Sequence, residues 1–277
     1  MKIFIYRKGA LGDTLSFLPL LFSLKQRYTY IYFAGNYLYR TIFQDMDFIK
    51  FVDADSKIVF DCIYNRHHFY FQDVERFIFF TNDILEENQN RHLFKALPEK
   101  SWFYKYPFDC LNINFNNIYI TMPVSYFSEF ERLIESKYVI IHPGSGGLKK
   151  NWPLEYFFEV EQYLNDYGIK CIYLLGEAEE KYLPMMKNKL FFHNLSFKKI
   201  IFLLTYAITY VGCDSGISHL AGILNVPGLA LFGPSSDVIY KPWGKMKVIK
   251  SKTNKIEDIK LNKVIKELGV MLENRQS

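Results

Sequence analysis

The sequence predicts an α/β protein with parallel sheets, organised as two domains. Short apolar segments typical of strands alternate with amphipathic helical segments, and this alternation begins a second time near Tyr138. Parallel strands need a crossover connection, usually a helix, so the pattern indicates two parallel sheets. We place the domains at residues 1–136 and 137–277, with the last helix able to pack back on the first domain.

The first half opens with a strand and a loop that leads into a helix. Asp13 is positioned to cap that helix with its carboxylate. The stretch 64–117 is irregular and rich in aromatic residues. The pattern predicts strands at 2–6, 30–33, 48–52, 58–62, 77–80 and 118–121, and helices at 13–27, 36–44, 83–94 and 125–136.

The second half has a clearer alternation of strands and helices. Pro153 lies in the first turn of a predicted helix and Gly168 follows its last residue, which is the usual asymmetry of helix ends. Ser196 is predicted to cap another helix. The pattern predicts strands at 138–142, 170–175, 190–192, 208–211, 229–232 and 248–250, and helices at 153–167, 178–188, 197–207, 214–224 and 260–272.

Composition indicates a folded protein with an anionic partner. The chain has 277 residues, of which 49% are hydrophobic, and a net charge of +5. This hydrophobic content argues against disorder. The excess of basic residues lies in the second half, which suits an anionic ligand or lipid headgroups. We expect no nucleic-acid partner, because no recognisable module accompanies the charge.

Cysteine usage and hydropathy limit the possible locations of the protein. The four cysteines form no CxxC pair, so we expect neither a disulfide framework nor a zinc site. The longest apolar run, 200–211, is shorter than the roughly 20 residues that a membrane span requires. We expect no signal peptide, because the first residues lack an h-region and a cleavage site. We therefore expect a cytoplasmic protein without a transmembrane segment, either free or peripheral on the inner face of the cytoplasmic membrane. A monomer is our expectation for its assembly, although neither cysteine usage nor hydropathy bears on it.

The most informative segment runs from Val211 to Pro234. An apolar strand ends in the turn Asp214-Ser215-Gly216, a helix follows, and a second strand leads to Gly233-Pro234. Ligands of parallel sheets bind at the carboxyl ends of the strands, and a free helix N-terminus there suits phosphate. His219 lies near the start of this helix and could reach the same phosphates, although a lone helical histidine is more often structural.

Two further strand ends carry polar residues. The loop His142–Pro153 is rich in glycine and contains Ser145 and Lys150, which suit a diphosphate; the alternative is a flexible turn with solvated lysines. It is not a Walker A loop. The segment Gly176–Glu180 places acids after a strand, where a carboxylate could accept both hydroxyls of a ribose.

The loop Gly9-Ala10-Leu11-Gly12-Asp13 lies between the first strand and the first helix. It does not match the GxGxxG dinucleotide fingerprint. Asp13 either caps the helix alone or faces a cleft. The pairs Asp45/Asp47 and Asp53/Asp55 are interpreted as surface turns rather than metal ligands. Adjacent His67-His68 is unsuited to metal binding, since neighbouring strand residues point to opposite faces.

Together these motifs resemble glycosyltransferase family 9, the ADP-heptose:lipopolysaccharide heptosyltransferases. The segments that carry the resemblance are Gly12-Asp13 with Pro19, His142-Pro143-Gly144 through Lys150-Asn151-Trp152-Pro153, Gly212 through Ala221, and Phe232-Gly233-Pro234-Ser235. The resemblance implies a GT-B architecture, in which two Rossmann-like domains face an interdomain cleft. The donor nucleotide-sugar would occupy the second domain and the acceptor the first, and catalysis would be inverting, with no cofactor and no metal.

The resemblance also implies roles for individual residues. Asp13 matches the position of the general base, and Lys150 matches a lysine that contacts the donor phosphate. The other positions that match donor contacts are Ser145, Gly146, Glu179, Leu195, Asp214, Ser215, Gly216 and His219. Among these, Glu179 is expected at the ribose, with Glu177 or Glu180 as alternatives, and Leu195 near the adenine. The candidates on the acceptor side are Gly12, Arg66, His67 and, more remotely, Arg91.

The function that the resemblance implies is transfer of a heptose from ADP-heptose to a lipid-linked lipopolysaccharide inner-core acceptor. Three alternatives stay open on the sequence. A different sugar could be transferred, to another surface glycan or to a protein. The chain could be an epimerase or hydrolase of nucleotide-sugars, or a non-catalytic protein that binds them. The residues do not identify the nucleotide base, the acceptor hydroxyl or the oligomeric state.

Overall fold

The computed structural model describes residues 1–65, 70–83, 85–116 and 118–273. The chain forms two compact units, Met1–Pro123 (unit 1) and Val124–Ser277 (unit 2). The boundary precedes the predicted one, because the segment that follows Pro123 packs on unit 2. Phe130 stacks on Phe202 with 6.0 Å between ring centroids, and Glu129 pairs with Lys199 at 2.5 Å.

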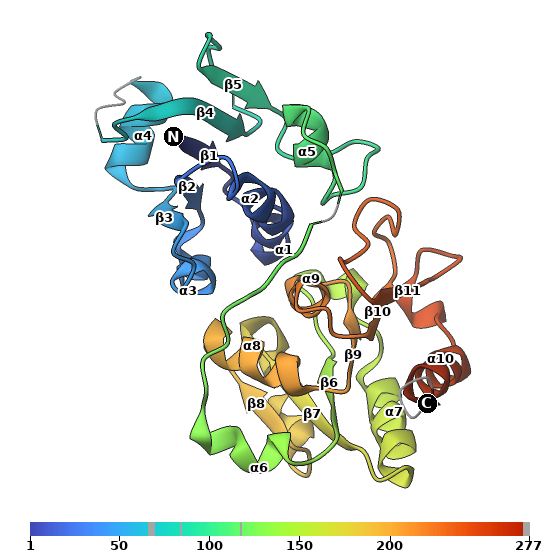
Figure 1. Cartoon of the computed structure of the whole chain (residues 1–277). Coiled ribbons are helices and arrows are strands. Elements are labelled where there is room, and N and C mark those ends of the chain that lie inside the picture. The colour runs from blue at the N-terminus through green and yellow to red at the C-terminus, as the bar shows by residue number, and fades with distance from the viewer. Residues whose placement is uncertain (66–69, 84, 117, 274–277) are drawn as a thin grey trace. The chain divides into compact units, whose positions relative to one another are not determined.

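Unit 1 is a parallel five-stranded sheet with helices on both faces (Figure 1). Its strands follow the order β3-β2-β1-β4-β5 across the sheet. The strands are β1 (Lys2–Tyr6), β2 (Tyr30–Gly35), β3 (Ile49–Asp53), β4 (Val74–Phe80) and β5 (Arg91–Phe94). The helices are α1 (Leu11–Leu15), α2 (Leu18–Leu24), the 3₁₀ helix η1 (Tyr37–Tyr39), α3 (Arg40–Phe43), α4 (Lys57–Tyr64) and α5 (Tyr106–Leu111).

Aromatic residues fill the space on either side of this sheet. Phe4 packs against Phe77 and Phe79 on the face that α4 covers. On the opposite face, Phe17 contacts the rings of Phe33 and Phe80 beside α2. Successive strand residues point to opposite faces, so buried apolar side chains at consecutive positions supply both layers.

Unit 2 is a parallel six-stranded sheet with the order β11-β10-β9-β6-β7-β8. Its strands are β6 (Tyr138–His142), β7 (Lys170–Leu175), β8 (Phe191–His193), β9 (Thr209–Cys213), β10 (Gly228–Phe232) and β11 (Met246–Lys250). Its helices are α6 (Glu131–Ile134), α7 (Leu154–Asp166), α8 (Phe197–Tyr206), α9 (Gly216–Ile223) and α10 (Leu261–Glu273). The 3₁₀ segments are η2 (Ser128–Phe130), η3 (Leu148–Lys150), η4 (Glu177–Met186) and η5 (Ile256–Asp258).

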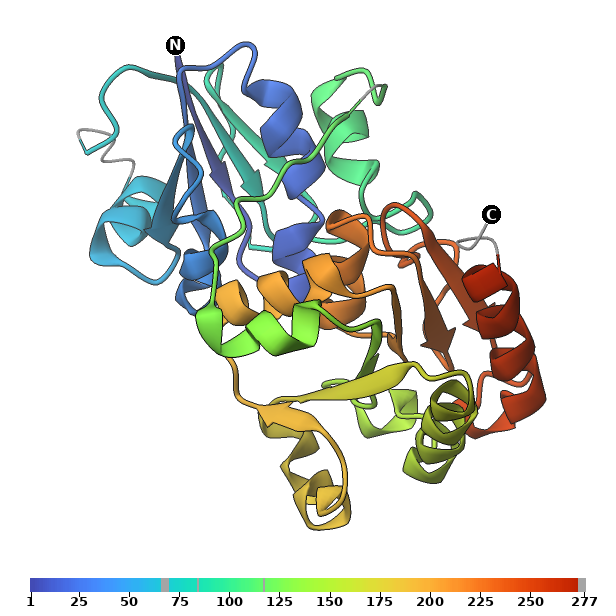
Figure 2. The ribbon, with the colours of Figure 1, turned by 60° about the horizontal axis from the view of Figure 1, so that its bottom comes forward.

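Helices α7 and α10 share one face of the unit 2 sheet (Figure 2). Both contribute to a single apolar cluster with the strands. Trp152 is buried in this cluster, and its indole N–H donates to the carbonyl of Ile259 at 3.0 Å. On the other face, the hydroxyl of Tyr138 donates to the carbonyl of Leu203 in α8 at 2.8 Å. Within unit 2, α10 contacts α7 and β10, and its Glu267 forms an ion pair with Lys247 of β11. Its packing on the first domain stays a prediction.

Most predicted elements of unit 2 are present, whereas unit 1 departs from prediction in several places. Residues 57–64, expected to contain a strand, form α4, because Val59, Cys62 and Ile63 recur at helical spacing on its buried face. The predicted helix 83–94 is wrong, since its end forms strand β5 beside β4. Residues 118–121, predicted to form a strand, have no regular secondary structure. Helix α5 was not predicted.

Short elements replace several longer predicted helices. Pro19 lies at the start of α2, so the predicted helix 13–27 is divided into α1 and α2. The predicted helix 178–188 is the 3₁₀ segment η4, which contains Pro184. Within the described ranges, no helix has the length and apolar character needed to span a bilayer.

Arg91 links α4 to the sheet of unit 1. Its side chain is buried and its guanidinium donates to the carbonyls of Cys62 and Ile63 at the end of α4. The ring of Phe79 lies 4.7 Å from the guanidinium carbon. Arg91, which the sequence analysis considered for acceptor binding, therefore has a structural role in unit 1.

Replacing Arg91 should destabilise unit 1. We expect Arg91→Met to lower the free energy of unfolding by about 2–4 kcal/mol, because two buried carbonyls lose a charged donor. Urea unfolding followed by circular dichroism measures the change. Lys95→Met is the control: Lys95 pairs with Glu99 at the surface, so its loss should cost less than about 0.5 kcal/mol. Equal stability of the two variants would contradict the assignment.

Candidate functional site

The carboxyl ends of β6 and β9 lie side by side in unit 2, with His142 opposite Gly212. The strand order reverses here: the chain continues from β6 to β7 on one side, and from β9 to β10 on the other. Loops that leave such neighbouring strands diverge, and ligands of open parallel sheets bind at this point. The loop after His142 and the turn after Cys213 are therefore placed together by topology alone.

Direct contacts join these two loops. The ammonium of Lys150 lies 2.7 Å from a carboxylate oxygen of Asp214, whose side chain is only 7% exposed. The hydroxyl of Ser145 donates to the backbone carbonyl of Asp214 at 2.8 Å. Lys150 remains 37% exposed, so its charge can reach a ligand. The structure thus brings together three of the residues that the sequence predicted for phosphate binding.

Helix α9 begins directly after this ion pair. Ser215 is its N-cap and accepts from the backbone N–H of Ser218 at 3.4 Å. Ser215 and Gly216 are partly exposed at the helix N-terminus, where free N–H groups and the helix dipole favour anions. His219 is buried in α9, and its contact with a ligand stays a prediction.

Glu179 connects a third strand end to the same loop. It is 2% exposed, and one carboxylate oxygen accepts from the backbone N–H of Gly176 at 2.8 Å. Its other oxygen, Oε1, is buried without a hydrogen-bond partner among the described residues. A methyl group built on Gly144 would lie 1.8 Å from that oxygen, so the carboxylate lies against the backbone of the glycine-rich loop.

The remaining donor candidates are less closely tied to this cluster. Glu177 and Glu180, the alternatives to Glu179, are exposed at the start of η4. Gly146 is exposed in the loop after β6. Leu195 is half-buried between β8 and α8, and its place beside an adenine stays a prediction.

Cys213 forms hydrogen bonds with both ends of the loop that follows β6. Its thiol donates to the carbonyl of Pro143 at 3.3 Å, and its sulfur accepts from the backbone N–H of Trp152 at 3.3 Å. Burial raises the pKa of Cys213 to about 12, so the thiol stays neutral near pH 7. Cys213 therefore positions the loop between Pro143 and Trp152 and is unsuited to act as a nucleophile.

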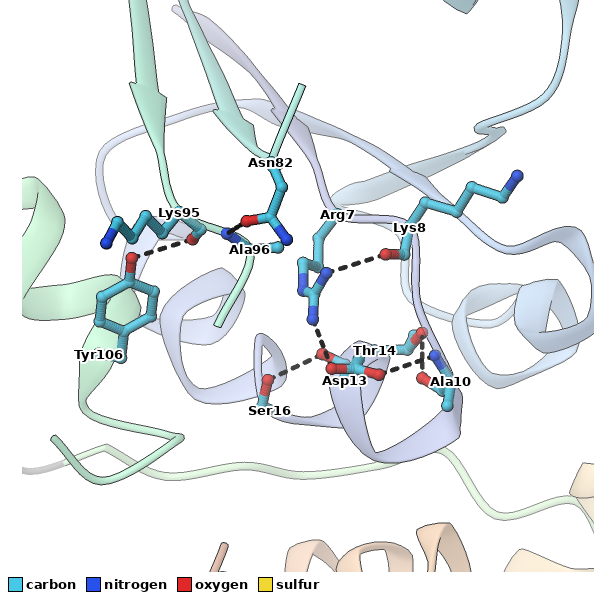
Figure 3. Close-up of polar contacts among 10 residues, drawn as sticks. All are labelled: Arg7, Lys8, Ala10, Asp13, Thr14, Ser16, Asn82, Lys95, Ala96 and Tyr106. Carbon is cyan, nitrogen blue, oxygen red and sulfur yellow. Dashed lines mark hydrogen bonds and ion pairs between the residues drawn. The ribbon is translucent and has the colours of Figure 1, made fainter. Parts of the chain in front are cut away.

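Unit 1 contains a cavity at the equivalent point of its own sheet. The order of strands reverses between β1 and β4, and the residues that follow both strands line a cavity of about 500 Å³. Figure 3 shows Arg7, Lys8, Asp13 and Asn82 among its polar residues. The lining comprises Tyr6, Arg7, Lys8, Gly9, Asp13, Phe80, Thr81, Asn82, Ala96 and Leu97.

Asp13 is held by two donors at the edge of this cavity. One carboxylate oxygen accepts from the guanidinium of Arg7, and the other accepts from the backbone N–H of Ala10 at 2.8 Å. Asp13 is the third residue of α1 and Ala10 is the N-cap, so the Asp13 carboxylate caps the helix from within its first turn and not from the N-cap position. With its side chain 21% exposed, the carboxylate is accessible from the cavity.

Sequence reasoning missed most of the polar residues of the unit 1 cavity, among them Arg7 and Asn82. Arg7 directly follows β1, and Asn82 follows β4 and accepts from the backbone N–H of Ala96 at 3.2 Å. Their position after neighbouring strands was the available signal, but the strand pairing was needed to use it. Of the predicted acceptor residues, Gly12 lies in α1, whereas Arg66 and His67 fall outside the described residues.

No group of three or more histidine, cysteine or acidic side chains is arranged for metal binding within the described ranges. Asp55, from one of the two Asp-x-Asp pairs, forms an ion pair with Lys8 at 2.6 Å. The backbone N–H of Asp55 donates to the carboxylate of Asp53 at 3.0 Å, as in a surface turn. Catalysis without a metal stays a prediction.

A family model described as glycosyltransferase family 9 (heptosyltransferase) matches residues 73–268, more than half of the chain. The chain is 24% identical to lipopolysaccharide heptosyltransferase 3 of Escherichia coli over 40% of its length. It is 28% identical to lipopolysaccharide heptosyltransferase 1 of Pseudomonas aeruginosa, also over 40%. The matches span about a third of both relatives. Lipooligosaccharide heptosyltransferase 2 of Campylobacter jejuni is 24% identical, covering 88% of this chain and 84% of the relative.

Solved structures share the fold along the whole chain. The glycosyl transferase family 9 protein of Veillonella parvula has a TM-score of 0.79 at 16% identity, covering 99% of this chain and 97% of its own. ADP-heptose lps heptosyltransferase II of E. coli has a TM-score of 0.78 at 18% identity and full coverage of both chains. TibC of E. coli, an iron-containing dodecameric glycosyltransferase, reaches 0.70 at 14%, covering all of this chain and 77% of its own. The predicted α/β GT-B fold with two parallel sheets is confirmed.

The two glycines of the loop after β6 allow a matched test of the Glu179 contact. We expect Gly144→Ala to lower the free energy of unfolding by about 1–3 kcal/mol, because the new methyl group displaces a buried carboxylate from its donor. Gly146→Ala should change it by less than about 0.5 kcal/mol, since nothing lies within 4 Å of the added atom. Urea unfolding measures both, and a Gly144→Ala protein as stable as Gly146→Ala would contradict the contact.

Proposed function

The chain belongs to glycosyltransferase family 9, and on this premise we propose that it transfers a heptose from ADP-heptose to a lipopolysaccharide inner-core acceptor with inversion. The observation that carries the proposal is the junction of two strand ends in unit 2. There Ser145, Lys150, Asp214 and the N-terminus of α9 form a cluster suited to a diphosphate. The relatives named heptosyltransferases support the choice of sugar.

Unit 2 would bind the donor. Backbone N–H groups of the α9 N-terminus would donate to the phosphates, while Lys150 supplies positive charge. The hydroxyl of Ser145 would donate to a phosphate by rotating away from the carbonyl of Asp214. Glu179 would accept from the ribose hydroxyls through its unpartnered oxygen, and Leu195 would pack near the base. Asp214, Ser215, Gly216, Gly146 and His219 complete the proposed donor set.

Charge develops on the diphosphate as the sugar leaves. The bond between the anomeric carbon and the phosphate oxygen breaks, and its electron pair stays on the diphosphate. Lys150 and the α9 N-terminus would stabilise this charge, and groups of this kind often make the largest contribution to catalysis. Lys150 already faces a carboxylate, so an anionic ligand would find an ammonium held in one position by Asp214.

Asp13 would act as the general base on the acceptor. As the acceptor oxygen bonds to the anomeric carbon, its proton moves to the Asp13 carboxylate. A single displacement of this kind inverts the configuration at that carbon. The accessible position of Asp13 at the unit 1 cavity supports this role. The proposal includes catalysis without a metal, by a cytoplasmic monomer that meets its lipid-linked acceptor at the membrane surface.

Removing the proposed base should slow transfer severely without weakening donor binding. We expect Asp13→Asn to reduce kcat by roughly 100- to 10,000-fold, because the amide cannot accept the proton. Release of ADP from ADP-heptose in the presence of a truncated lipopolysaccharide acceptor and EDTA measures transfer, and calorimetry measures ADP affinity. Asp73→Asn, at an exposed carboxylate paired with Lys2, is the control. An active Asp13→Asn protein would contradict the base assignment, and turnover of donor without acceptor would favour a hydrolase or epimerase.

Neighbouring lysines provide a test of donor binding. We expect Lys150→Met to weaken ADP binding roughly 10- to 100-fold, because the site loses a cation and the Asp214 carboxylate is left unpaired. Lys149→Met should have little effect, as Lys149 is exposed on the same short helix. Titration calorimetry with ADP, UDP and GDP measures both variants. Equal ADP affinities of the two would contradict the role of Lys150.

A further inference from the structure

Arg7 is an unusual residue in unit 1, because its charged side chain is only 5% exposed. Arginine is rarely buried unless it is paired. It directly follows β1, and its backbone N–H still donates to the carbonyl of Ala34 in β2 at 2.9 Å. The backbone at Arg7 is thus part of the sheet, which makes it a rigid support for the side chain.

The guanidinium of Arg7 is positioned by one contact and directed at another. One terminal nitrogen donates to the carbonyl of Lys8 at 2.9 Å, and the other pairs with the Asp13 carboxylate, as Figure 3 shows. Its Nε is buried without a hydrogen-bond partner in the described part of the chain. A buried donor without a partner is costly, and the bonds of the guanidinium to Lys8 and Asp13 offset part of this cost.

Asp13 is held on two sides as a result. The Ala10 N–H holds one oxygen, and Arg7 holds the other. Gly9 leaves no room for a side chain, since a methyl group there would lie 2.6 Å from the Cβ of Asp13. Each carboxylate oxygen can accept a second hydrogen bond, so the carboxylate can still receive a proton from a ligand in the cavity.

We propose that Arg7 is a positioning residue that fixes the Asp13 carboxylate in the orientation needed for proton abstraction. This inference rests on the proposed function. Arg7 itself cannot accept the proton, because a guanidinium stays protonated in proteins. Its effect is to restrict the carboxylate to one orientation, and a displacement of about 1 Å in such a site can reduce the rate 100-fold.

The test compares Arg7→Ala with the wild-type protein in the ADP-release assay. We expect kcat to fall roughly 10- to 100-fold, while KM for the acceptor and the calorimetric ADP affinity stay within about twofold. Added guanidinium ion at millimolar concentration should restore part of kcat in Arg7→Ala and leave Asp13→Asn unchanged. Arg40→Met, which removes an exposed arginine stacked on Tyr37, should retain wild-type kcat.

A double-mutant cycle shows whether Arg7 acts through Asp13. In the Asp13→Asn background, Arg7→Ala should lower the residual kcat by no more than about twofold, because the group it positions is gone. Arg7→Gln serves as a second variant if Arg7→Ala does not fold. Its amide can still donate to the carbonyl of Lys8 but carries no charge, so the same loss of kcat is expected.

The outcomes separate this inference from the proposed function. If Asp13→Asn is inactive while folded Arg7→Ala or Arg7→Gln has wild-type kcat, the role of Arg7 is refuted and the base assignment stands. A rise in acceptor KM with unchanged kcat would show that Arg7 binds the acceptor instead. The positioning role would also be overturned if the losses of kcat in the two single variants were additive in the double variant. The same holds if guanidinium did not restore any kcat in Arg7→Ala. An active Asp13→Asn protein would refute the base itself.

Discussion

Both candidate sites depend on a single constraint, the reversal of strand order within a parallel sheet. In unit 1 the reversal lies between β1 and β4, and in unit 2 between β6 and β9. At each point, two strands end side by side while their chains leave in opposite directions. The loops that follow carry polar groups which the sheet interior could not accommodate. A rigid parallel sheet therefore sets the positions of side chains that the local sequence alone could not bring together.

Each site contains an ion pair between a basic and an acidic side chain at this position. Arg7 pairs with Asp13 in unit 1, and Lys150 pairs with Asp214 in unit 2. Pairs of this kind offset the cost of removing charge from water, and breaking one by removing a partner leaves an uncompensated charge. The exposure differs in an informative way. In unit 1 the carboxylate of Asp13 is the more accessible partner, whereas in unit 2 it is the ammonium of Lys150. This difference suits a carboxylate that takes up a proton and an ammonium that meets a phosphate.

Apolar packing fixes the loops that carry these charges. In unit 2, Trp152 is buried and its backbone N–H donates to Cys213, while the Cys213 thiol donates to Pro143. The glycine-rich loop is thereby held at both ends by contacts to one residue of β9. Gly144 then allows the buried Glu179 carboxylate to lie against the loop. A loop held in this way binds a ligand at a lower entropic cost than a mobile one.

The sequence by itself determined the α/β class, the succession of elements in unit 2, and the family through its motifs. These features are encoded locally, because strand and helix periodicity and the glycine-rich turns each lie within a few residues. Only the tertiary structure decided that 57–64 is a helix, because a short apolar run fits either element until its neighbours are known. It also placed Glu179, rather than Glu177 or Glu180, against the loop, and paired Arg7 with Asp13. Such contacts depend on which strands become neighbours, and that choice is made by packing of the whole sheet.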